Sequence, residues 1–439
     1  MRRIALLFVA IFFLGINCFA QNDNRIRTLR TNIESNNEAI QNPRRNTNIR
    51  TWLDRGRLFY DAYNVNVGFL RFGLSPMEAR LYFREPREIV TSIDDGTEVE
   101  TWVYSSLRLN FVDGGLRTWE ETNPVVENPL MESARAFQRA RELDDRGRNA
   151  RRITDGLQSI VNDLEIRFFN EFYRLRFSEA YNTALERIEV NNLLGVTDTT
   201  YYFFAGFAAF AQSEIDSSMW TQAIQKFERA LEIGYREVGD NRGQIYNLLY
   251  LAYIGKGNPE TALRWAKTGF ERYPNYEQLM YNLINYYLER EENALALEYL
   301  EQAVARDPNN AVLLFAQGRV LDELGEREKA IVAYNASIAA NPTFFDAYFN
   351  LAVVFYNEAI RLMSEANDAR TQVEYDRLRG LADDEFYKAI APMEKALELN
   401  PTETSVIETL RSLYLRLRVR HPEFEAKFEE MNRRLEGLQ

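Results

Sequence analysis

Apolar and small residues recur through the middle of the chain with the spacing of amphipathic helices. Between 243 and 344 the same residue types return every 34 residues, and each segment closes on a proline. The closing prolines are Pro274, Pro308 and Pro342, and the small residues at one shared position are Ala262, Ala296 and Ala330. A period of this length predicts a repeated helix pair that stacks into a solenoid.

The residues of each repeat have local roles that explain the pattern. Small residues let two antiparallel helices approach closely, and large residues such as Tyr287 fill the space between them. Gly257 and Gly325 mark the turn inside a pair. Proline disfavours the helical conformation of the residue before it, so the second helix is expected to end at Asp307 and at Asn341.

A large residue, a small residue, an A-x-x-x-F-x-x-A pattern and a closing proline resemble the tetratricopeptide repeat (TPR). The resemblance covers 243–344 best. It implies a mainly α fold, a right-handed superhelix of helix pairs with a concave face that binds protein partners.

Looser repeats flank this segment. We predict a solenoid over 126–403 and polar capping helices over 404–439. In 157–190, Leu175 falls at a helical, repeat-like position. Pro342 and Pro401 are 59 residues apart, which is 25 more than one period. The added segment, 364–386, is interpreted as a helical spur about 18 Å tall or as a mobile acidic loop.

The first repeat contains a much longer insertion. Residues 21–64 are predicted to open this repeat, with Gly56 in the first helix, while the matching Ser133 and Phe137 lie far downstream. About 65 residues are therefore inserted, and we assign 65–125 to a small α+β domain.

Capping and alternation predict the elements of this insert. Ser75 and Pro76 begin a short helix. Period-two alternation around Trp102 and Leu109, with the turn at Asp113, predicts about three antiparallel strands. The residues resemble the SmpA/OmlA (BamE-like) module of outer-membrane assembly lipoproteins, and an unrelated α+β insert is the alternative. The matching residues are Gly73, Leu74, Ser75, Pro86, Trp102, Tyr104, Leu109, Phe111, Gly115 and Leu116, whereas Arg84 stands where the family has glycine.

Residues 1–20 have the basic start, apolar run and small-residue exit of a secretory signal peptide. We therefore expect an exported, periplasmic protein without a transmembrane segment in the mature chain, and a position peripheral to the outer membrane is one option. Cys18 is the only cysteine, and we expect cleavage after Ala20 in preference to a lipid anchor on Cys18. Cleavage changes the formal charge from −12 to −14, which opposes binding to nucleic acid.

The chain has few of the residue types that usually catalyse reactions or bind metal ions. His421 is the only histidine, and we interpret it as an exposed cation at a helix end. One histidine and no cysteine in the mature chain exclude the usual zinc sites and a Ser-His-Asp triad. No glycine-rich phosphate loop occurs. We therefore predict no catalytic, cofactor-binding or metal site, and an envelope hydrolase with a carboxylate pair is only a remote alternative.

The TPR resemblance implies that the solvent side of each first helix lines the binding groove. Aromatic residues at one shared position could form an exposed row that binds a partner, or their rings could pack inside the superhelix. The implied groove residues are Asn247, Leu251, Tyr281, Asn285, Phe315, Arg319, Phe349 and Val353.

The leading functional hypothesis is an exported, non-enzymatic scaffold or adaptor for protein or peptide partners in the cell envelope. A narrower alternative is an accessory factor in outer-membrane protein assembly, because the insert resembles a BamE-like module. The residues leave the oligomeric state undefined.

Overall fold

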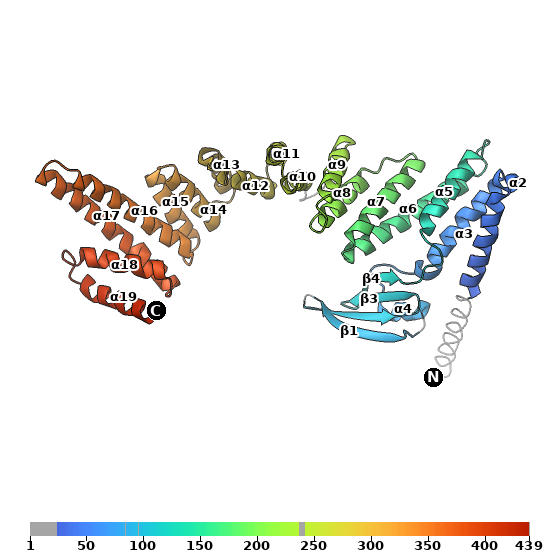
Figure 1. Ribbon diagram of the computed structural model, residues 1–439, viewed down its shortest axis with the longest axis horizontal. Coiled ribbons are helices and arrows are strands. Elements are labelled where there is room, and N and C mark those ends of the chain that lie inside the picture. Colours follow the sequence, from blue (N-terminus) through green and yellow to red (C-terminus); the bar gives the residue numbers. More distant parts are fainter. Residues whose placement is uncertain (1–23, 84, 95, 237–241, 439) are drawn as a thin grey trace. The chain divides into compact units, whose positions relative to one another are not determined.

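The computed structural model describes residues 24–83, 85–94, 96–236 and 242–438. The predicted signal segment, 1–20, lies outside these residues. The described chain forms two compact units, one reaching to Ala262 and the other beginning at Leu263, and each unit is described by itself. Figure 1 colours and labels their elements along the sequence.

The first unit consists of helices with one small sheet. Residues 24–41 are helical. The helices that follow are α2 (Pro43–Asn46), α3 (Ile49–Val67), α4 (Pro76–Tyr82), α5 (Pro129–Glu142), α6 (Ala150–Tyr173), α7 (Phe177–Leu193), α8 (Thr199–Gln212), α9 (Met219–Glu232) and α10 (Gln244–Gly255). The next helix, α11 (Pro259–Arg272), includes the boundary between the two units.

The described part of the second unit is helical throughout. Its helices are α12 (Glu277–Leu288), α13 (Asn293–Arg306), α14 (Ala311–Glu323), α15 (Arg327–Ala340), α16 (Phe345–Asn367), α17 (Gln372–Leu399), α18 (Thr404–Leu417) and α19 (Phe424–Leu438). Successive helices contact one another, and α14 also contacts α16, so the first helices of these two neighbouring pairs are adjacent. This is the predicted mainly α, TPR-like arrangement of helix pairs.

In some of the helix pairs, glycine allows a close approach between the two helices. A Cβ atom on Gly318 would lie 2.7 Å from the ring of Tyr334, and one on Gly206 would lie 2.6 Å from the ring of Phe227. In the first pair, α3 and α5, a Cβ on Gly56 would lie 2.8 Å from the ring of Phe137. The same contact therefore forms within pairs that differ widely in connection length.

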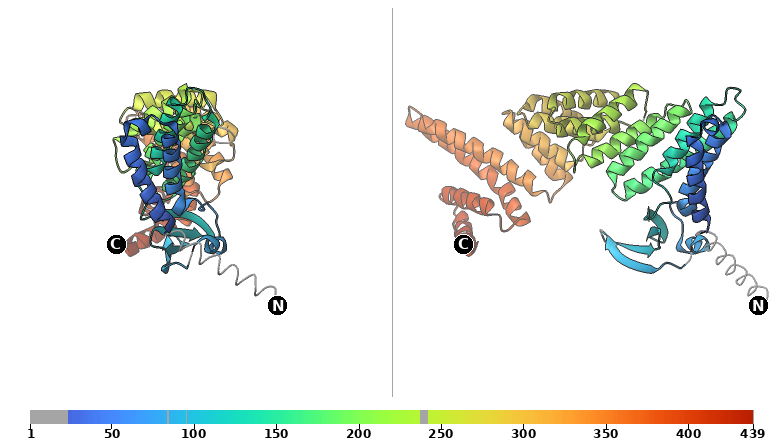
Figure 2. Two further views of the ribbon diagram at one scale, coloured as in Figure 1. Left: turned by 90° about the vertical axis from the view of Figure 1, so that its right-hand side faces the viewer. Right: turned by 45° about the vertical axis from the view of Figure 1, so that its right-hand side comes forward.

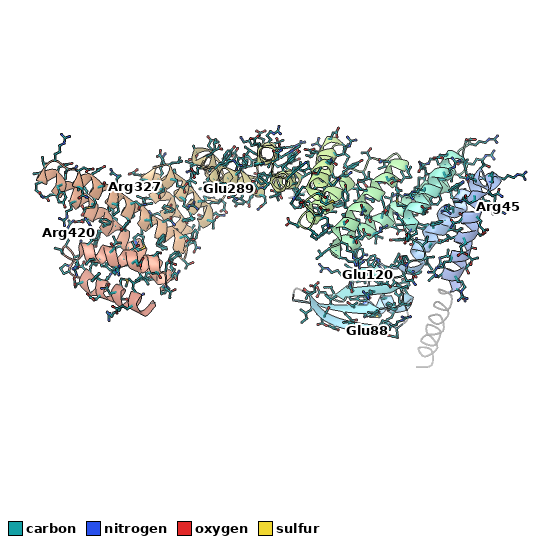
Figure 3. The ribbon with its side chains drawn as sticks, viewed as in Figure 1. Arg45, Glu88, Glu120, Glu289, Arg327 and Arg420 are labelled. Carbon is teal, nitrogen blue, oxygen red and sulfur yellow. The ribbon has the colours of Figure 1, made fainter. Side chains whose placement is uncertain are left out.

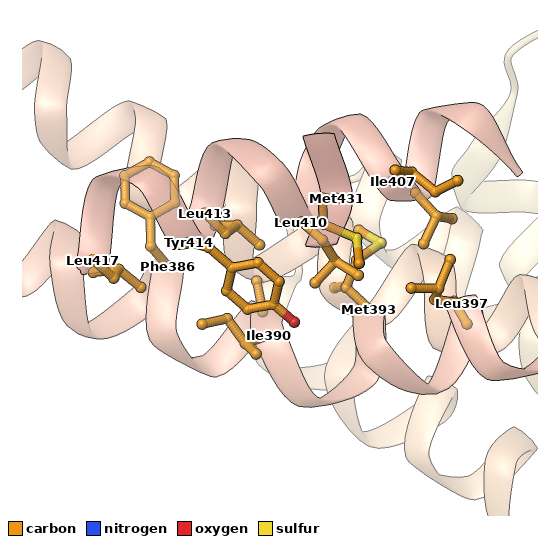
Figure 4. Close-up of a cluster of buried hydrophobic side chains, with 14 of the residues drawn as sticks. Phe386, Ile390, Met393, Leu397, Ile407, Leu410, Leu413, Tyr414, Leu417 and Met431 are labelled. Carbon is orange, nitrogen blue, oxygen red and sulfur yellow. The ribbon is translucent and has the colours of Figure 1, made fainter. Parts of the chain in front are cut away.

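The added residues at 364–386 are helical, except at the turn between α16 and α17. The two helices run side by side along their length (Figures 1 and 2). Their extended parts bury Leu362, Ala366, Leu378 and Ala382 against each other. Beyond them, α17, α18 and α19 share a large apolar core, shown in Figure 4. The extension is thus packed helix and not an acidic loop.

The insert between α3 and α5 contains α4 and a four-stranded antiparallel sheet in the order β1-β2-β3-β4. The strands are β1 (Glu88–Asp94), β2 (Thr97–Val103), β3 (Leu107–Val112) and β4 (Gly115–Glu121). Ser75 caps α4 in a capping box with Glu78, which confirms the predicted helix start. Trp102, Leu109 and Phe111 are buried beneath α4 in one core with Ala79.

Two predictions about local structure are wrong. The sequence predicts about three strands, but Leu116 and Trp119 lie on a fourth strand, because Asp113 and Gly114 both adopt positive φ and reverse the chain. Leu175 is predicted to be helical, but it has φ of 58° and is 72% exposed in the turn between α6 and α7. This apolar residue therefore lies in a turn and does not pack in the core.

Candidate protein-binding surfaces

The predicted groove residues of the second unit lie on α12, α14 and α16, the first helices of their pairs. Asn285 and Arg319 occupy equivalent positions one repeat apart, and both are exposed. Tyr281 and Val353 are half-buried. Because α14 and α16 contact each other, equivalent positions on these two helices belong to neighbouring rows of one surface.

Two of the predicted aromatic residues pack against other rings. Phe315 lies 5.2 Å from Phe344 and 5.9 Å from Tyr334, measured between ring centroids. Phe349 stacks on Phe345 at 5.9 Å. Such contacts are typical of structural aromatic pairs. They favour the packing interpretation for Phe315 and Phe349, and they leave the polar residues as the accessible part of this surface.

The remaining predicted residues are placed separately. Asn247 and Leu251 lie on α10 in the first unit, where Asn247 is half-buried and Leu251 is 37% exposed.

Burial is the largest effect that raises the pKa of the Tyr281 phenol, and the charges of Glu277 and Asp307 add to it. Tyr281 therefore stays a neutral hydrogen-bonding group at physiological pH.

His421 is less exposed than predicted. It follows α18, and its ring stacks on Tyr387 at 4.7 Å while its Nδ1 lies 3.5 Å from a Glu423 carboxylate oxygen. The ring therefore contributes to packing at the end of the helix. Over the described ranges, no three His, Cys, Asp or Glu side chains are grouped to hold a metal ion. In the same ranges, no helix combines the length and apolar character needed to cross a bilayer.

Sequence reasoning missed the junction that fixes the insert to the helices of the first unit. Asn170 on α6 accepts a hydrogen bond from the backbone N–H of Trp119 and donates one to its carbonyl, both at 2.9 Å. Gly73 and Leu74 exchange backbone hydrogen bonds with Leu116 at 2.8 Å. These contacts cover the outer edge of β4, so the sheet is docked on α6.

A charged cluster adds to this junction. Glu120 on β4 lies 2.9 Å from the Arg174 guanidinium and 2.8 Å from that of Arg176. Burial alone would raise the pKa of Glu120, but the hydrogen bonds and charges of Arg174 and Arg176 outweigh it and hold the pKa below its ordinary value. The neighbouring Glu121 accepts a hydrogen bond from Asn66 at 2.7 Å, and burial raises its pKa.

The insert also exposes much apolar surface, some of it beside this junction. Phe69 and Tyr82 stack at 5.0 Å although both are exposed to solvent. A cavity of about 540 Å³ opens between β4 and α6 and is lined by Phe72, Leu116, Phe169 and Tyr173. Exposed large hydrophobic residues cluster within 69–93, and they are Phe69, Phe72, Met77, Leu81, Tyr82, Ile89, Val90 and Ile93. Exposed apolar side chains that adjoin one another, such as the stacked Phe69 and Tyr82, are typical of interaction surfaces.

Comparison with known proteins identifies the repeat. The family model described as TPR repeat matches residues 318–358, which include α15 and most of α16. The chain therefore contains a tetratricopeptide repeat, as the sequence pattern predicts. The match lies outside the insert, so the resemblance to the SmpA/OmlA module stays a prediction.

The solved structures that match the chain include MamA proteins and one TPR repeat-containing protein. A MamA fragment from Desulfovibrio magneticus RS-1 is 22% identical, covers 45% of this chain and 98% of its own, and has a TM-score of 0.32. The C-terminal part of a TPR repeat-containing protein from Cytophaga hutchinsonii is 13% identical, covers 61% of this chain and 93% of its own, and has a TM-score of 0.41. No curated protein sequence matches the chain.

Proposed function

We propose that this chain, which contains tetratricopeptide repeats, is a non-enzymatic adaptor. It binds protein partners through the first helix of each helix pair. The observation that supports this most directly is the pair Asn285 and Arg319. Both side chains are exposed at equivalent positions of successive helix pairs, whose cores are closed by buried residues such as Leu300 and Tyr334. Packing does not require polar side chains at these positions.

The chemistry of these side chains suits an extended or helical peptide. The Asn285 amide can donate to and accept from a peptide backbone, and the Arg319 guanidinium can pair with a carboxylate. Arg319 lies 3.4 Å from Glu323, and both side chains are about half exposed. An exposed ion pair of this kind contributes little stability, so a partner's carboxylate can replace it.

The groove proposal is tested with a double substitution, Asn285→Ala with Arg319→Ala, in the full chain. The matched control is Gln302→Ala with Asn335→Ala, because these exposed residues lie on the second helices α13 and α15. Cross-linked partners from envelope extract would be quantified for each protein. We expect the groove variant to lose its partners by roughly tenfold and the control to keep them. Equal recovery by the groove variant and the unaltered chain would contradict the proposal.

We also propose that the adaptor works in the cell envelope, because residues 1–20 have the pattern of an export signal. A role in outer-membrane protein assembly is the narrower form of this proposal, and the resemblance of the insert to a BamE-like module supports it. Cell fractionation tests the location, since recovery only in the cytoplasm would rule it out. Depletion that leaves outer-membrane protein levels unchanged would argue against the assembly role.

A further inference from the structure

We infer that the free edge of β1 binds an extended segment of another protein by strand addition, and that this segment carries basic residues at both ends. The strand is the terminal one in the sheet order, and all its residues from Glu88 to Asp94 are exposed. This surface is separate from the first-helix residues of the proposed groove. The inference therefore goes beyond the adaptor function and does not depend on it.

The register identifies which backbone groups are free. Tyr104 donates its backbone N–H to the carbonyl of Leu107 at 2.8 Å, so the even-numbered residues of β2 bond to β3 and the odd-numbered ones bond to β1. Odd-numbered Val99 and Thr101 face Ser92 and Val90. It follows that the N–H and C=O groups of the intervening residues point away from β2, and these residues are Ile89, Thr91 and Ile93.

The opposite edge of the same sheet shows what a closed edge looks like in this fold. On β4, Asn170 bonds both backbone groups of Trp119, and Gly73 and Leu74 bond those of Leu116. Within the described ranges, no strand pairs with β1 on the side away from β2. An exposed edge of this length is a ready template for another strand.

The side chains of β1 can contribute apolar contacts to an added strand. Ile89 is opposite Trp102 in the register, so its side chain lies on the face of the sheet that α4 covers. Ile89 is nevertheless 45% exposed, and Ile93 is 79% exposed on the same face. The core of the insert therefore stops short of this edge, and alternate side chains of a partner strand could extend it.

The acidic side chains at the edge of β1 indicate which kind of partner strand can bind there. Glu88 and Asp94 stand at the two ends of β1, and Glu98 on β2 is also exposed. Across the described residues 85–94 and 96–100, Arg87 is the one base. If two copies of β1 paired with each other, the acidic ends would face acidic ends in either orientation, which is unfavourable. A strand with lysine or arginine at both ends would instead place a basic side chain opposite each acidic end of β1, which is favourable.

The first experiment measures binding of a labelled peptide, Lys-Val-Thr-Val-Thr-Val-Lys, to the full chain by fluorescence anisotropy. Thr91→Pro removes an outward N–H group, whereas Thr91→Ala keeps it and serves as the matched control. We expect binding in the range of about 10–100 μM, a loss of roughly tenfold in Thr91→Pro and a change below about twofold in Thr91→Ala. A peptide N-methylated at alternate residues should also bind at least roughly tenfold more weakly.

The second experiment does not depend on the folding of the proline variant. In the double variant Glu88→Lys with Asp94→Lys, preference should reverse toward the matched peptide Glu-Val-Thr-Val-Thr-Val-Glu. The inference is overturned if neither peptide binds the unaltered chain below about 1 mM, if N-methylation has no effect, or if charge reversal leaves the preference unchanged. Dimerisation of the unaltered chain that Thr91→Pro abolishes would also overturn it, because the edge would then pair with a second copy. Loss of peptide binding with retained groove partners separates this inference from the groove proposal.

Discussion

The repeat has two long interruptions, and they differ in how they satisfy their backbone hydrogen bonds. The extension of α16 and α17 adds helix, which satisfies its own backbone hydrogen bonds and buries Leu378 and Ala382 against the partner helix. The insert between α3 and α5 adds a sheet, which closes one edge with Asn170 and leaves the β1 edge unpaired. Figure 3 labels Glu120 near the closed edge and Glu88 on β1.

This difference indicates where function is encoded. The helical extension needs no further partner for its backbone, and its surface carries ion pairs such as Arg361 with Glu358 and Arg377 with Glu374. The insert keeps unpaired backbone groups and a concentration of exposed apolar side chains between 69 and 93. We therefore expect substitutions in the extension to change stability alone, and substitutions at the β1 edge to change binding.

The largest stability effect is expected at the closed edge. Asn170→Ala leaves the buried backbone groups of Trp119 without their partner and should lower the free energy of unfolding of the first unit by about 2 kcal/mol. Asn162→Ala is the control, because this exposed residue lies on the same helix. Denaturant unfolding with proteolysis of the insert measures both. A loss in Asn170→Ala no larger than that of the control would contradict the docking role.

A smaller effect is expected for the charged part of the junction. Glu120→Gln removes the pairing with Arg174 and Arg176 and should lower stability by about 1 kcal/mol at neutral pH. Because the folded-state pKa of Glu120 is lowered, its contribution is present above the ordinary glutamate pKa of about 4.3 and is lost as the pH falls through the lowered value. The variant and the unaltered chain should therefore converge in acid. Glu127→Gln, at an exposed position in the same junction, is the matched control for the Glu-to-Gln change.

The smallest effect is expected in the helical extension. Gly380 lies inside α17 with open space around it, so Gly380→Ala should raise the free energy of unfolding of the second unit by about 0.5–1 kcal/mol. The same change at Gly318 should destabilise, because the new methyl group would meet the buried Tyr334 ring. Thermal unfolding of both variants checks the signs. Destabilisation by Gly380→Ala would mean that the extension is not a simple continuous helix.

The repeat was predictable because its residues act locally. Small residues at fixed spacing and a closing proline determine where two helices meet and where the second ends, so Ala330 and the helix end before Pro342 are recognisable from the pattern alone. The capping box at Ser75 is local in the same sense. The fold class and the α+β character of the insert followed from such signals.

The sequence could not predict contacts that join distant segments. Asn170 lies in a helical, largely apolar stretch, and nothing near it indicates that its amide binds a strand 51 residues earlier. The free edge of β1 likewise depends on the order of strands in the sheet, which alternation does not define. The exposed row of aromatic residues was only partly predictable, because the neighbours of Phe315 and Phe349 decide whether the rings face solvent.

Residue-resolved hydrogen exchange on the free full chain tests the central claim most directly, since the claim is that the insert has one closed and one open edge. The amides of Ile89, Thr91 and Ile93 should exchange at least roughly tenfold faster than those of Val90 and Ser92, while the amides of Leu116 and Trp119 stay protected. Equal protection of all β1 amides, or exchange at Trp119 as fast as at Thr91, would contradict the account.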